Sequence, residues 1–212
     1  MTDMDWAAWH EMYEDENSGM PLRLARVRQR VREALDDQPA GPITIISMCA
    51  GQGRDLLGVL PDHPRRDDVR ARLVELDPGL AGDARRAAAE LPGVEVVEGD
   101  AANCAAYAGL VPADLVLVCG VFGNIADDQV RHTITHLPRL CRTGGTVFWT
   151  RHRGAPDLTP TVRDWFGANG FAEIAFDFAD GAHWSVGAHR LTGPSLPYDP
   201  DVRLFEFGSA KW

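Results

Sequence analysis

A glycine-bearing turn near residue 50 is the part of this sequence best suited to hold a ligand. It ends an apolar strand pattern that starts at Ile43, it contains Gly51 and Gly53, and an apolar helical pattern begins directly behind it. Because glycine has no Cβ, the backbone can turn tightly here and approach a ligand closely. A nucleotide-type ligand suits such a turn. Many Gly-x-Gly turns only connect a strand to a helix, however, so the downstream residues decide between the two interpretations.

An acidic residue ends the next strand pattern, which covers residues 71–77. That residue is Asp77, and Pro78 then opens a helical segment. In an open parallel sheet the first two strands lie side by side, and a carboxylate at the carboxyl end of the second can accept hydrogen bonds from both hydroxyl groups of a ribose. Asp before Pro is also a common way to cap a helix. The two roles are compatible, and we expect Asp77 to bind the hydroxyl groups of a ribose.

Strand and helix patterns alternate through most of the chain, which predicts an α/β fold with a doubly wound, mostly parallel sheet. Further strand patterns cover residues 94–98, 114–120, 144–150, 171–178 and 183–191. The run at 114–120 is apolar almost throughout, as is typical of a strand buried on both faces.

Four segments, in this order, resemble the nucleoside-binding motifs of class I S-adenosylmethionine-dependent methyltransferases: residues 47–53, 73–77, 98–101 and 113–120. The resemblance covers roughly residues 40–190. It implies a Rossmann-like methyltransferase fold whose sheet is closed by an antiparallel C-terminal hairpin. It also implies S-adenosyl-L-methionine as the cofactor and methyl transfer as the reaction.

The same resemblance implies a role for each motif. Gly51 and Gly53 line the methionine and ribose portions of the cofactor, Asp77 holds the ribose hydroxyl groups, and Asp100 accepts a hydrogen bond from the adenine amino group. With the neighbours of these residues and one N-terminal aromatic, the expected cofactor-binding residues are Cys49, Ala50, Gly51, Gly53, Asp77, Pro78, Asp100, Ala101, Gly120 and Tyr13.

Two positions depart from the family pattern. Ser47 stands where an acidic residue is usual near the end of the first strand, and Cys49 stands where the first glycine is usual. The usual contact to the amino group of the methionine moiety therefore needs another source, which we expect to be Asp55 or a carboxylate of the N-terminal segment. The chain also fails the dinucleotide fingerprint, because Leu56 stands where its last Gly or Ala belongs.

The first 40 residues are expected to form a helical segment in front of a domain of residues 41–212. Helical patterns cover residues 4–14 and 21–36, and Trp9 and Tyr13 lie one turn apart on the first of them. These aromatics serve either as a lid over the ligand or as core residues of a helix that packs on the sheet. The resemblance favours the lid.

The loops after the fourth and fifth strands supply two candidate catalytic residues, Asn124 and His152. Methyl transfer needs a positioned nucleophile and the exclusion of water, and it needs a base only when the acceptor must lose a proton. His152 is alternatively a surface histidine in a basic loop, and Asn124 alternatively caps the helix that begins near Asp127. Arg151 and Arg153 suit a carboxylate-bearing acceptor, or are simply solvated loop residues.

Composition limits the partners. The chain has 212 residues and a formal net charge of −10, which fits one enzyme-sized domain and repels phosphate backbones and anionic lipid. We therefore expect no nucleic-acid partner and no membrane association. The single lysine, Lys211, excludes reactions that need an internal lysine. The four cysteines show no C-x-x-C pairing, so we expect reduced cysteines and no metal site, and the lack of a leader pattern predicts a cytoplasmic location.

The predicted function is methyl transfer from S-adenosylmethionine to an oxygen or nitrogen of a small-molecule acceptor. Two alternatives stay open. The first is an enzyme on the same fold that transfers or cyclises the aminocarboxypropyl group, and the second is a nucleoside-binding sensor or subunit without catalysis. The oligomeric state is also open, with a homodimer as one alternative.

Overall fold

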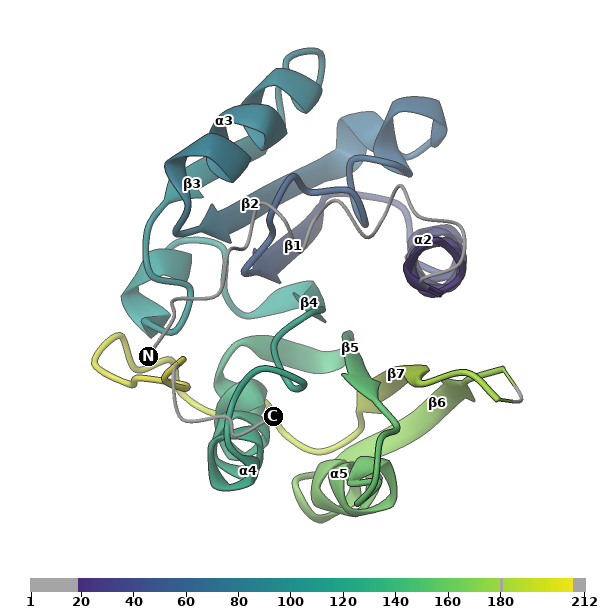
Figure 1. The fold of residues 1–212 in the computed structure, drawn as a ribbon. Coiled ribbons are helices and arrows are strands. Elements are labelled where there is room, and N and C mark those ends of the chain that lie inside the picture. The colour runs from purple at the N-terminus through teal and green to yellow at the C-terminus, as the bar shows by residue number, and fades with distance from the viewer. Residues whose placement is uncertain (1–18, 180, 208–212) are drawn as a thin grey trace.

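Seven strands form one sheet in the order β3-β2-β1-β4-β5-β7-β6 (Figure 1). The computed structural model describes residues 19–179 and 181–207. The strands are β1 Ile43–Met48, β2 Val69–Glu75, β3 Val94–Glu98, β4 Ala113–Val118, β5 Cys141–His152, β6 Phe171–Asp177 and β7 Trp184–Leu191. The pairs among the first five strands are parallel, and β7 pairs antiparallel with both β5 and β6. The predicted doubly wound sheet with an antiparallel C-terminal hairpin is therefore confirmed.

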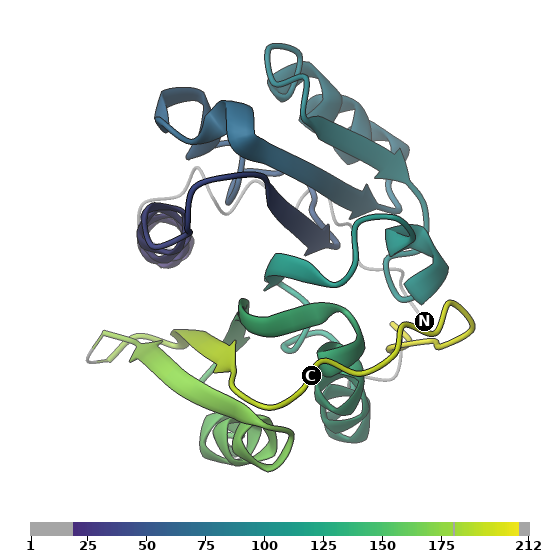
Figure 2. The same cartoon turned by 180° about the vertical axis from the view of Figure 1, so that it is seen from behind.

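Helices cover both faces of this sheet (Figures 1 and 2). The helices are α2 Met20–Asp36, α3 Pro78–Ala87, α4 Asp127–His136 and α5 Thr159–Ala168, with 3-10 turns η1 Leu60–Asp62, η2 Arg66–Asp68, η3 Cys104–Tyr107 and η4 Leu137–Arg139. Apolar residues of α2 and α3 share one core cluster, and those of α4, α5 and η3 share the other. Within the described part of the chain, no helix is long and apolar enough to cross a membrane.

Successive side chains of the central strands point to opposite faces of the sheet, so the hydrophobic core is divided between the two faces. Ile45 belongs to the cluster under α2 and α3, whereas Ile46 belongs to the cluster under α4 and α5, and both are fully buried. The spacing of Val27, Val31 and Leu35 brings one stripe of α2 onto the first cluster. The helix expected over residues 21–36 is thus present, whereas the pattern at 4–14, with Trp9, lies outside the described residues.

Two local expectations differ from the structure. β2 ends at Glu75 rather than at residue 77, because Asp77 already caps α3. The apolar pattern behind the glycine turn is not an α-helix: residues 54–59 form turns that lead into η1. Gly58 weakens a helix at this point and Pro61 cannot supply an interior N–H group, while the leucines of the pattern are buried all the same.

A chain of polar side chains runs from the core at Trp149 and His189 to the surface at Glu173 and Arg163, and it ties β5, β7, β6 and α5 together. The fully buried Trp149 donates its Nε1–H to His189 Nδ1 at 3.1 Å, and His189 Nε2 lies 3.6 Å from Glu173 Oε2. Arg163 in turn forms a bidentate pair with Glu173 at 2.6 and 2.8 Å. Because burial disfavours the charged imidazole, the pKa of His189 falls to about 4, although the Glu173 carboxylate acts in the opposite direction.

The lowered pKa of His189 predicts that the folded protein becomes less stable at acidic pH. His189 has its ordinary pKa near 6.5 when the chain is unfolded, so between pH 6.5 and 4 the unfolded state binds a proton that the folded state does not. Stability is therefore lost as the pH falls through this window, by about 2 kcal/mol at pH 5. Urea unfolding from pH 7.5 to 5 should show this loss in the wild type and not in His189→Gln, whose amide oxygen can still accept from Trp149. Parallel pH profiles for the two proteins would contradict the assignment.

Candidate functional site

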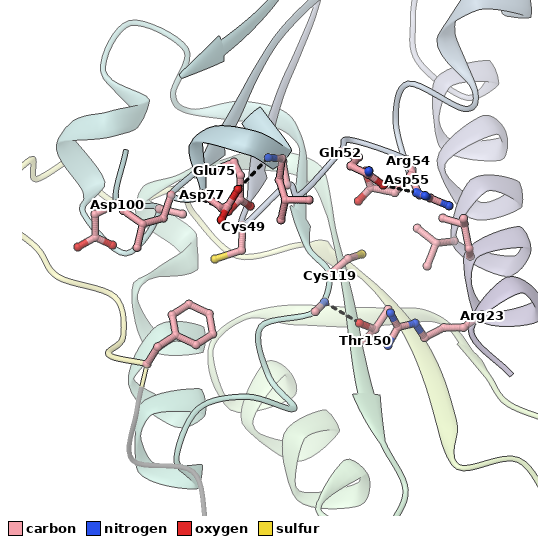
Figure 3. A pocket seen from close by; sticks show the side chains of 18 of the residues that line it. Arg23, Cys49, Gln52, Arg54, Asp55, Glu75, Asp77, Asp100, Cys119 and Thr150 are labelled. Atoms are coloured by element: carbon pink, nitrogen blue, oxygen red, sulfur yellow. Dashed lines mark hydrogen bonds between the residues drawn. The ribbon is translucent and has the colours of Figure 1, made fainter. Parts of the chain in front are cut away.

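A cavity of about 380 Å³ opens at the carboxyl ends of β1, β2 and β4 (Figure 3). From β1 the chain continues to β2 on one side of it, and β4 lies on its other side, so the strand order reverses here. Open α/β sheets bind ligands outside the carboxyl ends of the strands at such a switch point. The cavity is large enough for a small molecule, since such pockets typically measure ~300–1,000 Å³. Its lining is Arg23, Leu24, Val27, Cys49, Ala50, Gln52, Arg54, Asp55, Glu75, Leu76, Asp77, Pro78, Leu80, Asp100, Ala101, Cys119, Gly120, Thr150 and Phe207.

The glycine turn is held by Glu75, the last residue of β2. Gly51 N–H donates to Glu75 Oε2 at 2.7 Å, and Asp77 N–H donates to Glu75 Oε1 at 2.9 Å. Gly51 and Gly53 have φ of 55° and 70°, which favours glycine at both positions. A Cβ on Gly53 would also lie 2.6 Å from the side chain of Leu57. The carboxylate therefore fixes the turn and still faces the cavity.

Asp77 has the capping role that the sequence offered as its alternative. Its Oδ1 accepts from Leu80 N–H at 2.9 Å, and Pro78 is the first residue of α3. Both Asp77 and Pro78 also line the cavity. Two carboxylates, those of Glu75 and Asp77, thus stand where the sequence analysis placed one. Glu75 is a cavity residue that the sequence prediction missed, and the feature that could have revealed it is its position at the end of the apolar strand pattern.

Asp100 lies at one end of the cavity, beyond Glu75 and Asp77 (Figure 3). Its Oδ1 accepts from Ala102 N–H at 2.9 Å, and its Oδ2 accepts from Arg203 Nη1 at 2.7 Å. Arg203 comes from the far end of the chain, so no local motif could have linked it to Asp100. This end of the cavity consequently offers three acidic side chains as hydrogen-bond acceptors.

The opposite end carries charges of both signs: Arg23, Arg54 and Asp55 (Figure 3). Asp55 is buried, and its Oδ1 accepts from the N–H of Leu56 at 2.8 Å. Burial raises the pKa of Asp55, while the Leu56 N–H and, more weakly, the charges of Arg28 and Arg23 lower it. The buried carboxylate predicted as a possible replacement for the missing motif acid therefore does line the cavity.

The middle of the cavity is apolar and lined by two thiols, Cys49 and Cys119 (Figure 3). Burial raises the pKa of both well above the ordinary thiol value, so both are neutral near pH 7. Cys49 has a φ of 49°, a left-handed conformation that explains why glycine suits this position. Ser47, the other departure from the motif, is buried in β1, and its hydroxyl has no hydrogen-bond partner among the described residues.

Most of the expected cofactor-binding residues line this one cavity: Cys49, Ala50, Asp77, Pro78, Asp100, Ala101 and Gly120. Gly51 and Gly53 shape the turn behind it without forming part of its lining. Tyr13 lies outside the described residues.

The two candidate catalytic residues do not line the cavity. Asn124 is buried and donates from Nδ2 to Gly120 O at 2.5 Å, so it holds the loop between β4 and α4. The alternative interpretation of Asn124 as the cap of this helix is wrong, because α4 has Ala126 at its N-cap position. His152 ends β5 and lies against Gly123 of the same loop. Partial burial, followed by the charge of Arg151, lowers the pKa of His152.

The two arginines beside His152 are engaged within the protein. Arg151 is buried and donates to Phe122 O and to Asp127 Oδ1, which fastens β5 to the loop before α4. Arg153 donates to Asp157 Oδ2 at 3.1 Å. Neither residue lines the cavity, so the structure does not direct their guanidinium groups at a ligand there.

The chain matches no protein-family model and no curated protein sequence. Solved structures, in contrast, resemble it over most of its length. Magnesium protoporphyrin IX methyltransferase from Synechocystis PCC 6803, solved with bound SAM, is 13% identical over 89% of this chain and 91% of its own, with a TM-score of 0.65. The N-methyltransferase NodS from Bradyrhizobium japonicum WM9 is 15% identical over 84% and 99%, with a TM-score of 0.59.

An O-methyltransferase family protein from Burkholderia thailandensis is 17% identical over 85% of this chain, with a TM-score of 0.58. The chain spans only 62% of that protein. The similar structures thus include O- and N-methyltransferases. They confirm that this chain has the Rossmann-like methyltransferase fold predicted from its motifs.

The cap role of Asp77 predicts a specific stability change. Asp77→Ala removes the acceptor for Leu80 N–H and should cost about 1 kcal/mol in the free energy of unfolding. Asp77→Asn should stay close to the wild type, because Asn caps a helix about as well as Asp. Urea unfolding of the three proteins checks this, and equal losses for both variants would show that charge rather than capping is the stabilising property.

Proposed function

We propose that this protein binds S-adenosylmethionine and transfers its methyl group to an oxygen or nitrogen of a small-molecule acceptor. The observation that carries the proposal is the two-ended character of the cavity. Hydrogen-bond acceptors gather at one end, charges of both signs gather at the other, and an apolar middle separates them. A nucleoside joined to an amino acid through a sulfonium centre has this same distribution of groups.

The acidic end suits the nucleoside. A ribose presents two hydroxyl donors and adenine presents an amino group, and Glu75, Asp77 and Asp100 offer acceptors for them. An ionised carboxylate has about four lone-pair positions, of which backbone N–H groups occupy two at Glu75. We assign the ribose to Glu75, at the end of β2, with Asp77 beside it as the helix cap. Asp100 remains the proposed partner of the adenine amino group.

The mixed end suits the amino acid portion. The guanidinium groups of Arg23 and Arg54 attract a carboxylate, and Asp55 attracts an ammonium group. Asp55 thereby supplies the anionic partner that the motif position of Ser47 lacks. A buried carboxylate whose pKa is raised by desolvation gains most from such a cationic partner.

The residues of this chain have a limited part in the chemistry. When bound, S-adenosylmethionine supplies an already activated methyl group. The protein holds the two ends of the cofactor, keeps the middle of the cavity dry with Cys49, Cys119 and Gly120, and positions the acceptor. His152, whose lowered pKa keeps it neutral near pH 7, is the proposed base for an acceptor that must lose a proton. Asn124 holds the loop that faces His152.

The net charge of −10 repels phosphate backbones, so we propose a small-molecule acceptor rather than a nucleic acid. A cytoplasmic location remains part of the proposal. Among the described residues, no group of three or more His, Cys, Asp or Glu side chains is arranged to hold a metal ion.

Product analysis tests the reaction. The protein is incubated with S-adenosylmethionine and a panel of carboxylate, phenol and amine acceptors, and the products are identified by mass spectrometry. We expect S-adenosylhomocysteine together with an acceptor that has gained one methyl group. Release of methylthioadenosine would instead favour aminocarboxypropyl transfer or cyclisation. Tight binding with no product from any acceptor would favour the sensor.

The role of Asp55 is tested by binding. Asp55→Asn should weaken S-adenosylhomocysteine roughly tenfold or more, because a charged hydrogen bond contributes about 1.5–3 kcal/mol. Methylthioadenosine lacks the amino acid group and should bind both proteins equally. Calorimetric titration of both proteins with each ligand checks this. If Asp55→Asn lost as much affinity for methylthioadenosine as for S-adenosylhomocysteine, the assignment would be contradicted.

The same titration has a pH dependence. Burial raises the pKa of Asp55, so its carboxylate becomes protonated at a higher pH than an exposed aspartate. Wild-type affinity for S-adenosylhomocysteine should therefore fall as the pH drops through that raised pKa, whereas Asp55→Asn should show no such fall.

A further inference from the structure

The C-terminal segment returns from the hairpin to the acidic end of the cavity. Residues 194–207, here called the C-terminal strap, leave β7 and run back past α4 towards η3 (Figure 2). No motif in the sequence pointed to this segment, and the proposed reaction does not use it.

Hydrogen bonds from two elements anchor the strap. On the side of η3, Cys104 N–H donates to Val202 O at 3.0 Å and Leu204 N–H donates to Ala102 O at 2.7 Å. On the side of α4, Thr133 Oγ1 donates to Leu204 O at 2.8 Å, and His132 Nε2 lies 3.0 Å from Arg203 O. Leu204 is fully buried. The strap is therefore a fixed part of the fold between these two elements.

Two side chains of the anchored strap bear on the cavity: Arg203 contacts Asp100, and Phe207 forms part of the lining. Arg203 donates to Asp100 Oδ2 at 2.7 Å, while Asp100 Oδ1 already accepts from Ala102 N–H. Phe207 lines the cavity itself, and its ring packs edge-on against the buried Phe205 with ring centroids 5.4 Å apart. The strap thus adds Phe207 to the cavity lining and places Arg203 against Asp100, which also lines the cavity.

We propose that the C-terminal strap completes the nucleobase subsite: Phe207 packs against the adenine ring, and Arg203 is a positioning residue that holds the Asp100 carboxylate towards the adenine amino group. The inference rests on the proposed function, because it takes the bound ligand to be an adenine nucleoside. Aromatic rings bind bases through their π-faces, and a bidentate-capable guanidinium fixes a carboxylate in one orientation. With both oxygens of Asp100 held, the carboxylate selects a base that presents an amino group over one that presents a carbonyl oxygen.

Calorimetric titration of the full chain with S-adenosylhomocysteine tests Phe207. Phe207→Ala should weaken binding roughly five- to thirtyfold, as base stacking on an aromatic side chain is lost. Phe207→Tyr should bind like the wild type. The matched control is Phe178→Ala, because Phe178 has a similar exposure, 46% against 43%, but lies beyond the end of β6 and does not line the cavity. This control should leave the affinity unchanged.

A second ligand tests Arg203. S-inosylhomocysteine carries a carbonyl oxygen in place of the adenine amino group, so the wild type should prefer S-adenosylhomocysteine, and Arg203→Gln should reduce that preference at least about fivefold. Arg203→Lys should retain more of the preference than Arg203→Gln. The control is Arg190→Gln, an exposed arginine of β7 that pairs with Asp37 and does not line the cavity. A merely structural role for Arg203 would weaken both ligands equally.

The outcomes separate the two proposals. If the wild type binds S-adenosylhomocysteine and Phe207→Ala binds it equally well, the role of the strap is overturned while the proposed function stands. An equal loss in Phe178→Ala also overturns it, since the effect would then not be local to the cavity. If the wild type binds no S-adenosylhomocysteine, the proposed function is overturned and the inference with it. Melting temperatures of each variant confirm that the titrated protein is folded.

Discussion

The carboxylate of Glu75 is the group on which the site depends. Its two oxygens accept from Gly51 N–H in the turn after β1 and from Asp77 N–H at the start of α3, so one side chain joins two neighbouring strand ends. A backbone N–H group in a glycine turn needs a partner when it is buried, and an ionised acceptor is a strong one. This junction joins the glycine turn, the start of α3 and one part of the cavity lining.

The parallel core brings this junction and the other groups to one edge. Strands β1 and β4 are buried on both faces and end next to one another, so whatever follows them faces the same cavity. Their continuations carry the thiols of Cys49 and Cys119, which keep the middle of the cavity apolar. The charged groups come from elements further out: Glu75 and Asp100 from the ends of β2 and β3 on one side, and Arg23 from α2 on the other.

Sequence patterns were sufficient for the sheet, because β1 and β4 are apolar runs and the other strands are shorter or alternating patterns separated by helices and glycine turns. They were less reliable at boundaries. The strand pattern at 71–77 continued through Leu76, an exposed apolar residue, and so placed the end of the strand at Asp77, whereas β2 ends at Glu75. The apolar pattern behind the glycine turn looked helical, yet Gly58 and Pro61 divide it into turns and η1.

Contacts between distant segments could not be read from the sequence. Arg203 meets Asp100 across 103 positions, and Arg23 reaches the cavity from a helix that precedes the first strand. The sequence offered two interpretations of Arg151, an acceptor-binding residue or a solvated loop residue, whereas it is buried in β5 with Phe122 and Asp127 as partners. Such pairings depend on how the helices and strands pack, because packing decides which charged side chains come close enough to form hydrogen bonds.

The most direct measurement is a crystal structure of the full chain with S-adenosylhomocysteine bound. We expect both ribose hydroxyl groups within hydrogen-bond distance, about 2.7 Å, of the Glu75 carboxylate, with the amino acid portion at Arg23 and Asp55. A ligand that lies in the opposite direction, or whose ribose contacts neither oxygen of Glu75, would contradict it.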